Sequence, residues 1–345
     1  MIEIIEDENT RQIAEKEFYE KDFKFSYSSF TKLLWNPAAF YQMYVLGIRE
    51  ETTSPSLING KVIHALLLSE NIFNELFIIS PDNLPTGNNK LVIDRVFNHH
   101  IELLSNGGEK TELNEYSNAI LDILVDIKLH QSLKTDQQRI DKIITEENIN
   151  YWTFLNSRNG RQLIDLETYY YCLNATKMVR ESPELVKLMG LGVSSFDNIT
   201  VLNECPLEKN KEEKYPFGLK GILDNIVVNH DEKIIYINDL KTTSKNLSNF
   251  HESIEIYSYW LQAIIYIILV YENFTSLILD EKYEVKFHFI VIDKYFMAYA
   301  FPLSLSTQNQ WLDRFKEQVL PQADYHYSQR KYKLPYKFCT KQVVL

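Results

Sequence analysis

The sequence predicts an α/β fold, a mixed central β-sheet flanked by helices, and three observations support this prediction. Two β-branched runs, 218–228 and 233–243, are separated by a short polar stretch, as in an antiparallel hairpin. The apolar spacing of 253–271 is that of a long helix, and 284–301 has the pattern of a second hairpin. Helical patterns before the first hairpin and between the two supply the layers that cover a sheet.

Composition indicates a soluble globular protein. The chain has 345 residues, of which 45% are hydrophobic, enough for the core of one large domain or two. The longest apolar run, 260–270, is too short to span a membrane and contains Gln262. The acidic start, 1–8, lacks the basic residues of a signal peptide. We therefore expect a cytoplasmic protein that makes no membrane contact.

Three separated cysteines, Cys172, Cys205 and Cys339, fit a reducing compartment and exclude a cysteine-based zinc or iron–sulphur motif. The net charge of −11 argues against binding nucleic acid through the overall field of the protein. Any such contact must be local. The basic, aromatic tail at 326–345 suits phosphates and stacked bases, but it could equally be a terminal segment docked on an acidic body.

Residues 1–24 form an acidic N-terminal arm, and the domain proper is expected over 25–325. Ser28–Trp35 is predicted to be a capped helix that ends near Asn36 and Pro37. After Gly60 the spacing fits a buried helix that carries His64, and a single histidine on such a face is more often a core residue than a ligand.

A helical subdomain or insertion is expected at about 90–190, where apolar stripes recur with helical spacing. The simplest interpretation of its runs of charged residues is that they form the solvent-exposed faces of these helices. Phe196–Cys205 is predicted to be the strand that leads to the first hairpin.

Acidic and basic side chains lie at the end of that hairpin. Asp239 and Lys241 leave the second strand on one face. A two-residue turn at His230 and Asp231 would pair Asn229 with Glu232 and set Ile222 opposite Asp239, with Asp224 one step along on the same face. These charges would be costly to bury unless they pair with one another or bind a metal. A cross-strand ion pair with a purely structural role is the alternative.

With these segments in hand, the chain resembles PD-(D/E)XK nucleases, and within them phage-type exonucleases of the exonuclease VIII (RecE-like) group. The resemblance rests on an ordered series that spans 25–305: Ser28–Ser29 to Phe40, Gly60–Leu66, Gly221–Asp224, Asp239–Thr243, Gln262–Ala263 with Tyr266, and Phe289–Lys294. It implies a restriction-endonuclease-like core. A further acid that relatives place on the preceding strand has no clear counterpart; Glu204 is the nearest and is not included among the candidates.

The resemblance also implies roles for individual residues. Asp224, Asp239 and Lys241 would be catalytic, and His64, the two aspartates and the Leu240 carbonyl would bind Mg²⁺ or Mn²⁺. Gln262 and Tyr266, with Tyr259 on the same helix face, would bind the substrate strand.

By the same resemblance, the expected activity is metal-dependent exonucleolytic hydrolysis of linear DNA, double-stranded rather than single-stranded, in phage-type recombination or DNA processing. A homo-oligomeric ring and a single-strand annealing protein are the partners that it implies, and the host cytoplasm is the place of action if a phage encodes the chain. Two alternatives stay open: an inactive nuclease-fold module for DNA binding or assembly, and a single-strand or structure-selective nuclease of the same superfamily.

Overall fold

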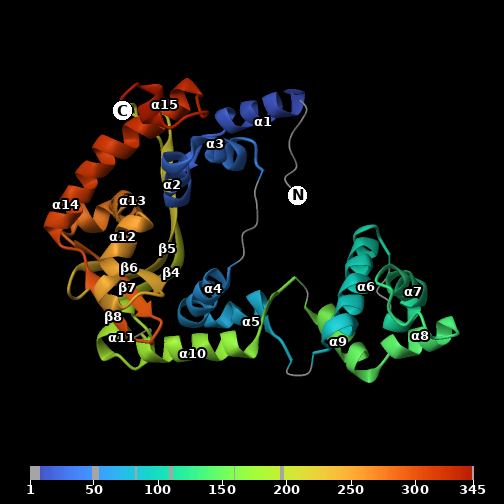
Figure 1. The fold of residues 1–345 in the computed structure, drawn as a ribbon. Coiled ribbons are helices and arrows are strands. Elements are labelled where there is room, and N and C mark those ends of the chain that lie inside the picture. Colours follow the sequence, from blue (N-terminus) through green and yellow to red (C-terminus); the bar gives the residue numbers. More distant parts are fainter. Residues whose placement is uncertain are drawn as a thin grey trace. The chain divides into compact units, whose positions relative to one another are not determined.

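The computed structural model describes residues 8–48, 54–81, 84–108, 112–158, 160–194 and 198–343 (Figure 1). It divides into two compact units. The first joins Met1–Glu70 with Cys172–Leu345, and the second is Asn71–Tyr171. The helical unit therefore begins and ends earlier in the chain than the expected range of about 90–190.

The first unit is built on a mixed sheet of six strands in which β5 and β6 are central. The order is β1-β5-β6-β7-β8, and β4 also pairs with β5. The β6 and β7 strands run parallel, whereas β5 is antiparallel to both β4 and β6. The strands are β1 (Lys24–Phe25), β4 (Ile199–Lys209), β5 (Gly218–Asn229), β6 (Ile234–Thr243), β7 (Glu284–Asp293) and β8 (Ala298–Pro302).

Strand β5 pairs with β4 along one edge, from residue 219 to residue 229. Its opposite edge is shared by two strands, β6 and β1. There β6 pairs with 225–229, and β1 pairs with Gly218 and Leu219. Residues 220–224 have no ladder partner on that edge among the described strands. This gap between β1 and β6 is where the candidate site lies.

The expected register of the first hairpin is wrong. Asn229 pairs with Ile234, so four residues rather than two form the turn. The Asn229 Oδ1 accepts the backbone N–H groups of Asp231 (3.1 Å) and Glu232 (2.9 Å), which draws the chain into a wider loop. Asn225 consequently pairs with Asn238, which puts Asp224, instead of Ile222, in line with Asp239.

Helices cover the sheet and meet it through one large apolar core, which includes side chains of β5, β6 and β7 and of helix α13. The helices of this unit are α1 (Glu8–Glu20), α2 (Tyr27–Trp35), α3 (Pro37–Phe40), α4 (Pro55–Leu68), α10 (Leu166–Arg180, shared with the second unit), α11 (Pro183–Met189), α12 (Phe250–Ile256), α13 (Tyr259–Asn273), α14 (Leu305–Arg314), α15 (Leu320–Gln329) and α16 (Tyr336–Cys339).

The helix predicted over 253–271 is broken. It forms α12 and α13, and Ser258 between them has a φ of 56°. A left-handed residue that is neither Gly nor Asn gives no signal in the sequence. The break lets Tyr259 begin a new helix beside the sheet.

Both ends of the described chain pack on this unit. Phe18 of α1 is buried in its core, and so is Tyr332, whose hydroxyl lies 2.8 Å from that of Tyr19. Part of the predicted tail at 326–345 is therefore docked on the domain. Residues 1–7 of the predicted arm and the expected strand start at Phe196 lie outside the described residues.

The second unit is mainly helical, with its own core. It contains α5 (Phe73–Leu76), α6 (Gly87–Ser105), α7 (Ser117–Asp126), α8 (Asp136–Ile143) and α9 (Glu146–Ser157), and a parallel pair, β2 (Phe77–Ile79) and β3 (Gln162–Ile164). Its buried His100 lies within hydrogen-bond distance of the Tyr116 hydroxyl and of Asn156 Oδ1, so it is a core residue with both ring nitrogens partnered.

Among the described residues, no single helix is both long and apolar enough to cross a membrane; the bent pair Leu247–Ile256 and Tyr259–Asn273 meets those criteria by length and composition alone.

Candidate active site

Three acids from adjacent strands lie in one row beside the gap in the sheet. The register pairs Asn203 with Asn225, so Glu204 of β4 is in line with Asp224 of β5, and Asp224 is in line with Asp239 of β6. Residues directly opposite each other project from the same face of a sheet. The site thus begins as three carboxylates from three strands.

Asp224 lies where the pairing of β5 with β6 ends. Its side-chain Oδ2 accepts the backbone N–H of Leu240 at 2.8 Å, in place of a backbone hydrogen bond between the two strands. The side chain is buried. This hydrogen bond holds one carboxylate oxygen and leaves the other available to a cation.

Asp239 and Lys241 form a buried ion pair. The Lys241 Nζ lies 2.5 Å from Asp239 Oδ2, and the aspartate side chain is 0% exposed. Burial raises the pKa of Asp239 to about 6, although the nearby lysine opposes the shift. Burial alone would lower the pKa of Lys241, but Asp239 and Asp224 outweigh it and hold that pKa above its ordinary value. The lysine is therefore an ammonium group at neutral pH.

Tyr259 at the start of α13 lies against this ammonium, 5.1 Å from the Lys241 Nζ to the ring centroid. Helix α2 reaches the same place, because the Tyr27 hydroxyl donates to the backbone carbonyl of Tyr257. Burial raises the pKa of Tyr259, so its phenol stays protonated at neutral pH. The aromatic side chains limit the access of water to Lys241.

His64 reaches the acids from helix α4. Its Nδ1 lies 3.4 Å from Glu204 Oε1, and its Nε2 lies 3.3 Å from the Leu240 carbonyl oxygen and 3.8 Å from Asp224 Oδ2. Burial lowers the pKa of His64, but Asp224 and Glu204 reverse the shift and raise that pKa above its ordinary value. The imidazole is held by groups that would share a cation with it.

Ligand atoms of His64, Glu204 and Asp224 all lie within 4.8 Å of one another. A nitrogen and two carboxylates form a donor set suited to Mn²⁺ or Mg²⁺. The Asp239 carboxylate lies outside this group of three, and no hydrogen-bond donor besides the paired lysine reaches its oxygens among the described residues. Three carboxylates, two of them buried, face one ammonium group and one imidazole, and a divalent cation would balance their charge.

Glu204 is the residue that sequence reasoning left out. It has a φ of 47° inside a strand, a strained conformation for a glutamate. The position of the Glu204 carboxylate beside His64 depends on this backbone conformation and on the alignment of Glu204 with Asp224, 20 residues later. The local sequence pattern indicates neither of them. The signal that could have identified it was its place as the acid nearest to the expected position.

Gln262 and Tyr266 of α13 form a relay to the free edge of β5. The Gln262 Nε2 donates to the Tyr266 hydroxyl (2.9 Å), which donates to the Ile222 carbonyl (2.8 Å). Gln262 Oε1 is buried and has no hydrogen-bond partner among the described residues. A Cβ added at Gly221 would lie 3.0 Å from Tyr266 Cε1, so this glycine permits the close approach of the helix.

The predicted residues His64, Asp224, Asp239, Leu240 and Lys241 thus meet in one place, with Tyr259 beside the lysine. The acids also act on the relay: after burial, which is the largest effect, Asp239 and Asp224 raise the pKa of Tyr266. Gln262 and Tyr266 are tied to the same strand as Asp224, through the hydrogen bond from the Tyr266 hydroxyl to the Ile222 carbonyl.

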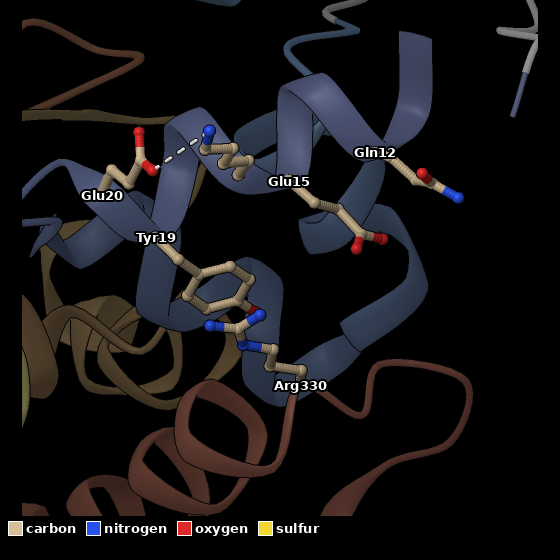
Figure 2. Close-up of a pocket in the computed structure, with 6 residues that line it drawn as sticks. Gln12, Glu15, Tyr19, Glu20 and Arg330 are labelled. Atoms are coloured by element: carbon tan, nitrogen blue, oxygen red, sulfur yellow. Dashed lines mark ion pairs between the residues drawn. The ribbon is translucent and has the colours of Figure 1, made fainter. Parts of the chain in front are cut away.

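A separate hollow lies between α1 and the turn after α15 (Figure 2). Its lining carries both signs of charge: Lys16 pairs with Glu20 at 3.7 Å, and the Arg330 guanidinium stacks 4.2 Å from the Tyr19 ring centroid. Arg330 belongs to the predicted basic segment, but here it packs against the domain. This hollow does not contain the residues of the candidate site.

Comparison with solved structures gives four matching chains. One is a proposed exonuclease from Eubacterium rectale, which is 9% identical, with 100% of this chain and 95% of that chain covered and a TM-score of 0.48. No curated protein matches the sequence. The family model of the PD-(D/E)XK nuclease superfamily matches residues 24–339, which contain both the sheet and the site, and this chain therefore belongs to the PD-(D/E)XK nuclease superfamily.

Proposed function

We propose that the chain is a metal-dependent DNA exonuclease that hydrolyses phosphodiester bonds at the gap between β1 and β6. The observation that carries this proposal is the convergence of His64, Glu204 and Asp224 beside the Asp239–Lys241 pair. Carboxylates that hold a divalent cation next to an ammonium group suit a reaction in which negative charge builds on phosphoryl oxygens.

Glu204, Asp224, His64 and the Leu240 carbonyl would hold the ion, with Asp239 as a further carboxylate beside them. A bound Mg²⁺ or Mn²⁺ would supply Lewis acidity toward the phosphoryl oxygen and a water of lowered pKa. The Leu240 carbonyl and His64 Nε2 are 3.3 Å apart, so both face the same small volume. The nitrogen ligand would favour Mn²⁺ over Mg²⁺.

Lys241 would act as a cation throughout, because its pKa is held above the ordinary lysine value. It would position the attacking water and stabilise the charge on the phosphoryl oxygens; it is not suited to accept the proton of that water. Asp239 would keep the ammonium aimed into the site. Gln262, whose buried Oε1 meets no hydrogen-bond donor in the described part of the chain, and Tyr266 would orient the scissile strand.

The preference for linear duplex ends rests on the RecE-like resemblance. So do a role in phage-type recombination or DNA processing, a homo-oligomeric ring and a single-strand annealing partner. A ring would reconcile the net charge of −11 with DNA binding, because it could confine the basic surface to a channel.

The test is digestion of an end-labelled linear duplex, the same DNA as a closed circle, single strands and flaps, each with Mg²⁺, Mn²⁺ or chelator. We expect loss of the linear duplex with metal and none with chelator or with the circle. Equal digestion of the circle would overturn exonuclease action. Faster digestion of single strands or flaps would support the structure-selective alternative. DNA binding without cleavage in either metal would support the inactive module.

A further inference from the structure

A row of asparagines lies on the opposite face of the sheet from the acids, and each one is next in sequence to a site acid. Asn203 precedes Glu204, Asn225 follows Asp224, and Asn238 precedes Asp239. The three amides pair across the same strands, Asn203 with Asn225 and Asn225 with Asn238. Because strand side chains alternate, the two rows are back to back.

Hydrogen bonds run through this row in one direction. The Asn238 Nδ2 donates to Asn225 Oδ1 at 2.7 Å, and the Asn225 Nδ2 donates to Asn203 Oδ1 at 2.7 Å. Asn225 and Asn238 are 0% and 1% exposed, so these bonds form out of water. Buried amides are costly when unpaired, so the row strongly favours a single register.

The row is also bonded to two helix ends. The Asn238 and Asn225 amides donate to the carbonyls of Leu188 (2.9 Å) and Met189 (3.1 Å), at the C-terminus of α11. The Asn203 Nδ2 donates to the Leu68 carbonyl at 2.8 Å, at the C-terminus of α4. The last carbonyls of a helix generally have no partner within the helix, so side-chain amides are suitable donors to them. Helix α4 is the helix that carries His64, one turn before Leu68.

We propose that Asn203, Asn225 and Asn238 are positioning residues that hold the metal-binding groups in place. The row fixes the register of the three strands that carry the acids, and its last bond ties the histidine helix to the same strands. None of the three amides would touch metal or substrate. This inference rests on the proposed function, since it concerns the geometry of that site.

The main test uses Asn203→Val, because Asn203 is exposed and its replacement should leave the fold intact. The matched control is Thr200→Val, which removes another side-chain hydrogen bond of β4, between Thr200 Oγ1 and His230 Nε2 (3.1 Å), near the start of the strand. We expect Asn203→Val to weaken Mn²⁺ affinity by about tenfold, the usual effect of losing a group that orients ligands, and the control to leave it unchanged.

A second pair of variants keeps the inference testable without metal. Asn225→Leu breaks the centre of the row, and Val227→Ala makes a cavity two residues along on the same face of β5. In metal-free protein, exchange of the Leu240 amide hydrogen, which is bonded to Asp224, should speed up in Asn225→Leu by more than the loss of global stability explains. In Val227→Ala it should follow global stability alone.

The outcomes separate the two proposals. Equal Mn²⁺ affinity in Asn203→Val and wild type, or Leu240 exchange that follows global stability in both β5 variants, would overturn the positioning role. A wild-type protein that binds Mn²⁺ but cleaves no DNA would overturn the nuclease and leave this result standing. If wild type binds no Mn²⁺, the proposed metal site fails, and the exchange measurement alone decides the role of the row.

Discussion

The Lys241 ammonium lies 2.5 Å from the Asp239 carboxylate, and both side chains come from one face of strand β6. The pair can be buried because each charge meets the other, yet it leaves Lys241 14% exposed at the edge of the gap. This arrangement gives the lysine a fixed direction and a permanent charge. It also makes the role of the lysine separable from metal binding.

Lys241→Met should lower the rate of DNA cleavage by about 10²–10³-fold, the usual effect of removing one group that stabilises transition-state charge. Its Mn²⁺ affinity should change little, because the ligand atoms of His64, Glu204 and Asp224 remain. Single-turnover cleavage and calorimetric Mn²⁺ titration measure the two quantities separately.

Lys286→Met is the matched control, since Lys286 pairs with Glu284 two residues away on β7, at 3.1 Å, in an exposed position. Its cleavage rate should equal that of wild type. If Lys241→Met cleaved DNA at the wild-type rate, the ion pair would have a structural role only.

Asp224→Asn should weaken Mn²⁺ binding by at least about tenfold, because a neutral amide oxygen replaces a carboxylate ligand. The fold should persist, since an amide oxygen still accepts the Leu240 N–H. Asp293→Asn is the control: Asp293 is also buried and also accepts backbone N–H groups, from Tyr295 (2.9 Å) and Met297 (3.0 Å). Equal Mn²⁺ affinity in the two variants would remove Asp224 from the site.

The buried Asp239 carboxyl should make the metal-free protein lose stability as pH rises. Its pKa is raised to about 6 in the folded state, from an ordinary value of 3.8. Such a group contributes stability that is fully present below the unfolded pKa and is lost as pH rises through the folded pKa. Between about pH 4 and 6 this loss amounts to roughly 3 kcal/mol.

Urea unfolding of metal-free wild type and Asp239→Asn from pH 4 to 7 checks this prediction, because titrating groups that do not interact with Asp239 cancel in the difference between the two proteins. The stability of wild type should fall relative to the variant as pH rises. A constant difference would show that Asp239 titrates near its ordinary pKa. Saturating Mn²⁺ should offset the loss, since an ion that binds the folded state stabilises it.

His64→Gln should reduce the preference for Mn²⁺ over Mg²⁺, because imidazole nitrogen suits Mn²⁺ better than Mg²⁺. The pKa of His64 is raised above its ordinary value of 6.5 in the metal-free protein. Protons should therefore still compete with Mn²⁺ for the imidazole at pH 6.5 and somewhat above it. Mn²⁺ and Mg²⁺ affinities of both proteins at pH 6 and 8 provide the check. A Mn²⁺ to Mg²⁺ affinity ratio that is the same in the variant would place His64 outside the metal's ligands.

The central hairpin could be predicted from sequence because β-branched runs and alternation are local signals. The two strands, the face shared by Asp239 and Lys241, and the second hairpin at 284–301 all follow from such patterns. The register could not be predicted, because Asn229 caps a four-residue loop in which Lys233 has a φ of 53°. A turn of two residues was the simpler expectation. It would have aligned Ile222, instead of Asp224, with Asp239.

The rest of the site depends on tertiary contacts. His64 reaches Asp224 from 160 positions earlier in the chain, so only the fold or a resemblance can bring the two together. Ser258 breaks a helix without glycine or proline, and Glu204 has a left-handed conformation inside a strand. In both places, tertiary contacts outweigh the local preference of the residue.

The strained backbone at Glu204 leads to the last prediction. A glutamate at φ 47° is less stable than a glycine there, by about 1 kcal/mol, because its Cβ crowds the neighbouring carbonyl. Glu204→Gly should therefore stabilise the metal-free protein by about that amount and weaken Mn²⁺ binding by about tenfold.

Glu204→Gln separates the two effects, since it keeps the strain and removes the charge. It should weaken Mn²⁺ binding without the gain in stability. Thermal unfolding and Mn²⁺ titration of the three proteins measure both effects. If Glu204→Gly were less stable than wild type, contacts of the side chain rather than strain would dominate at this position; if both variants bound Mn²⁺ as wild type does, Glu204 would not be a ligand.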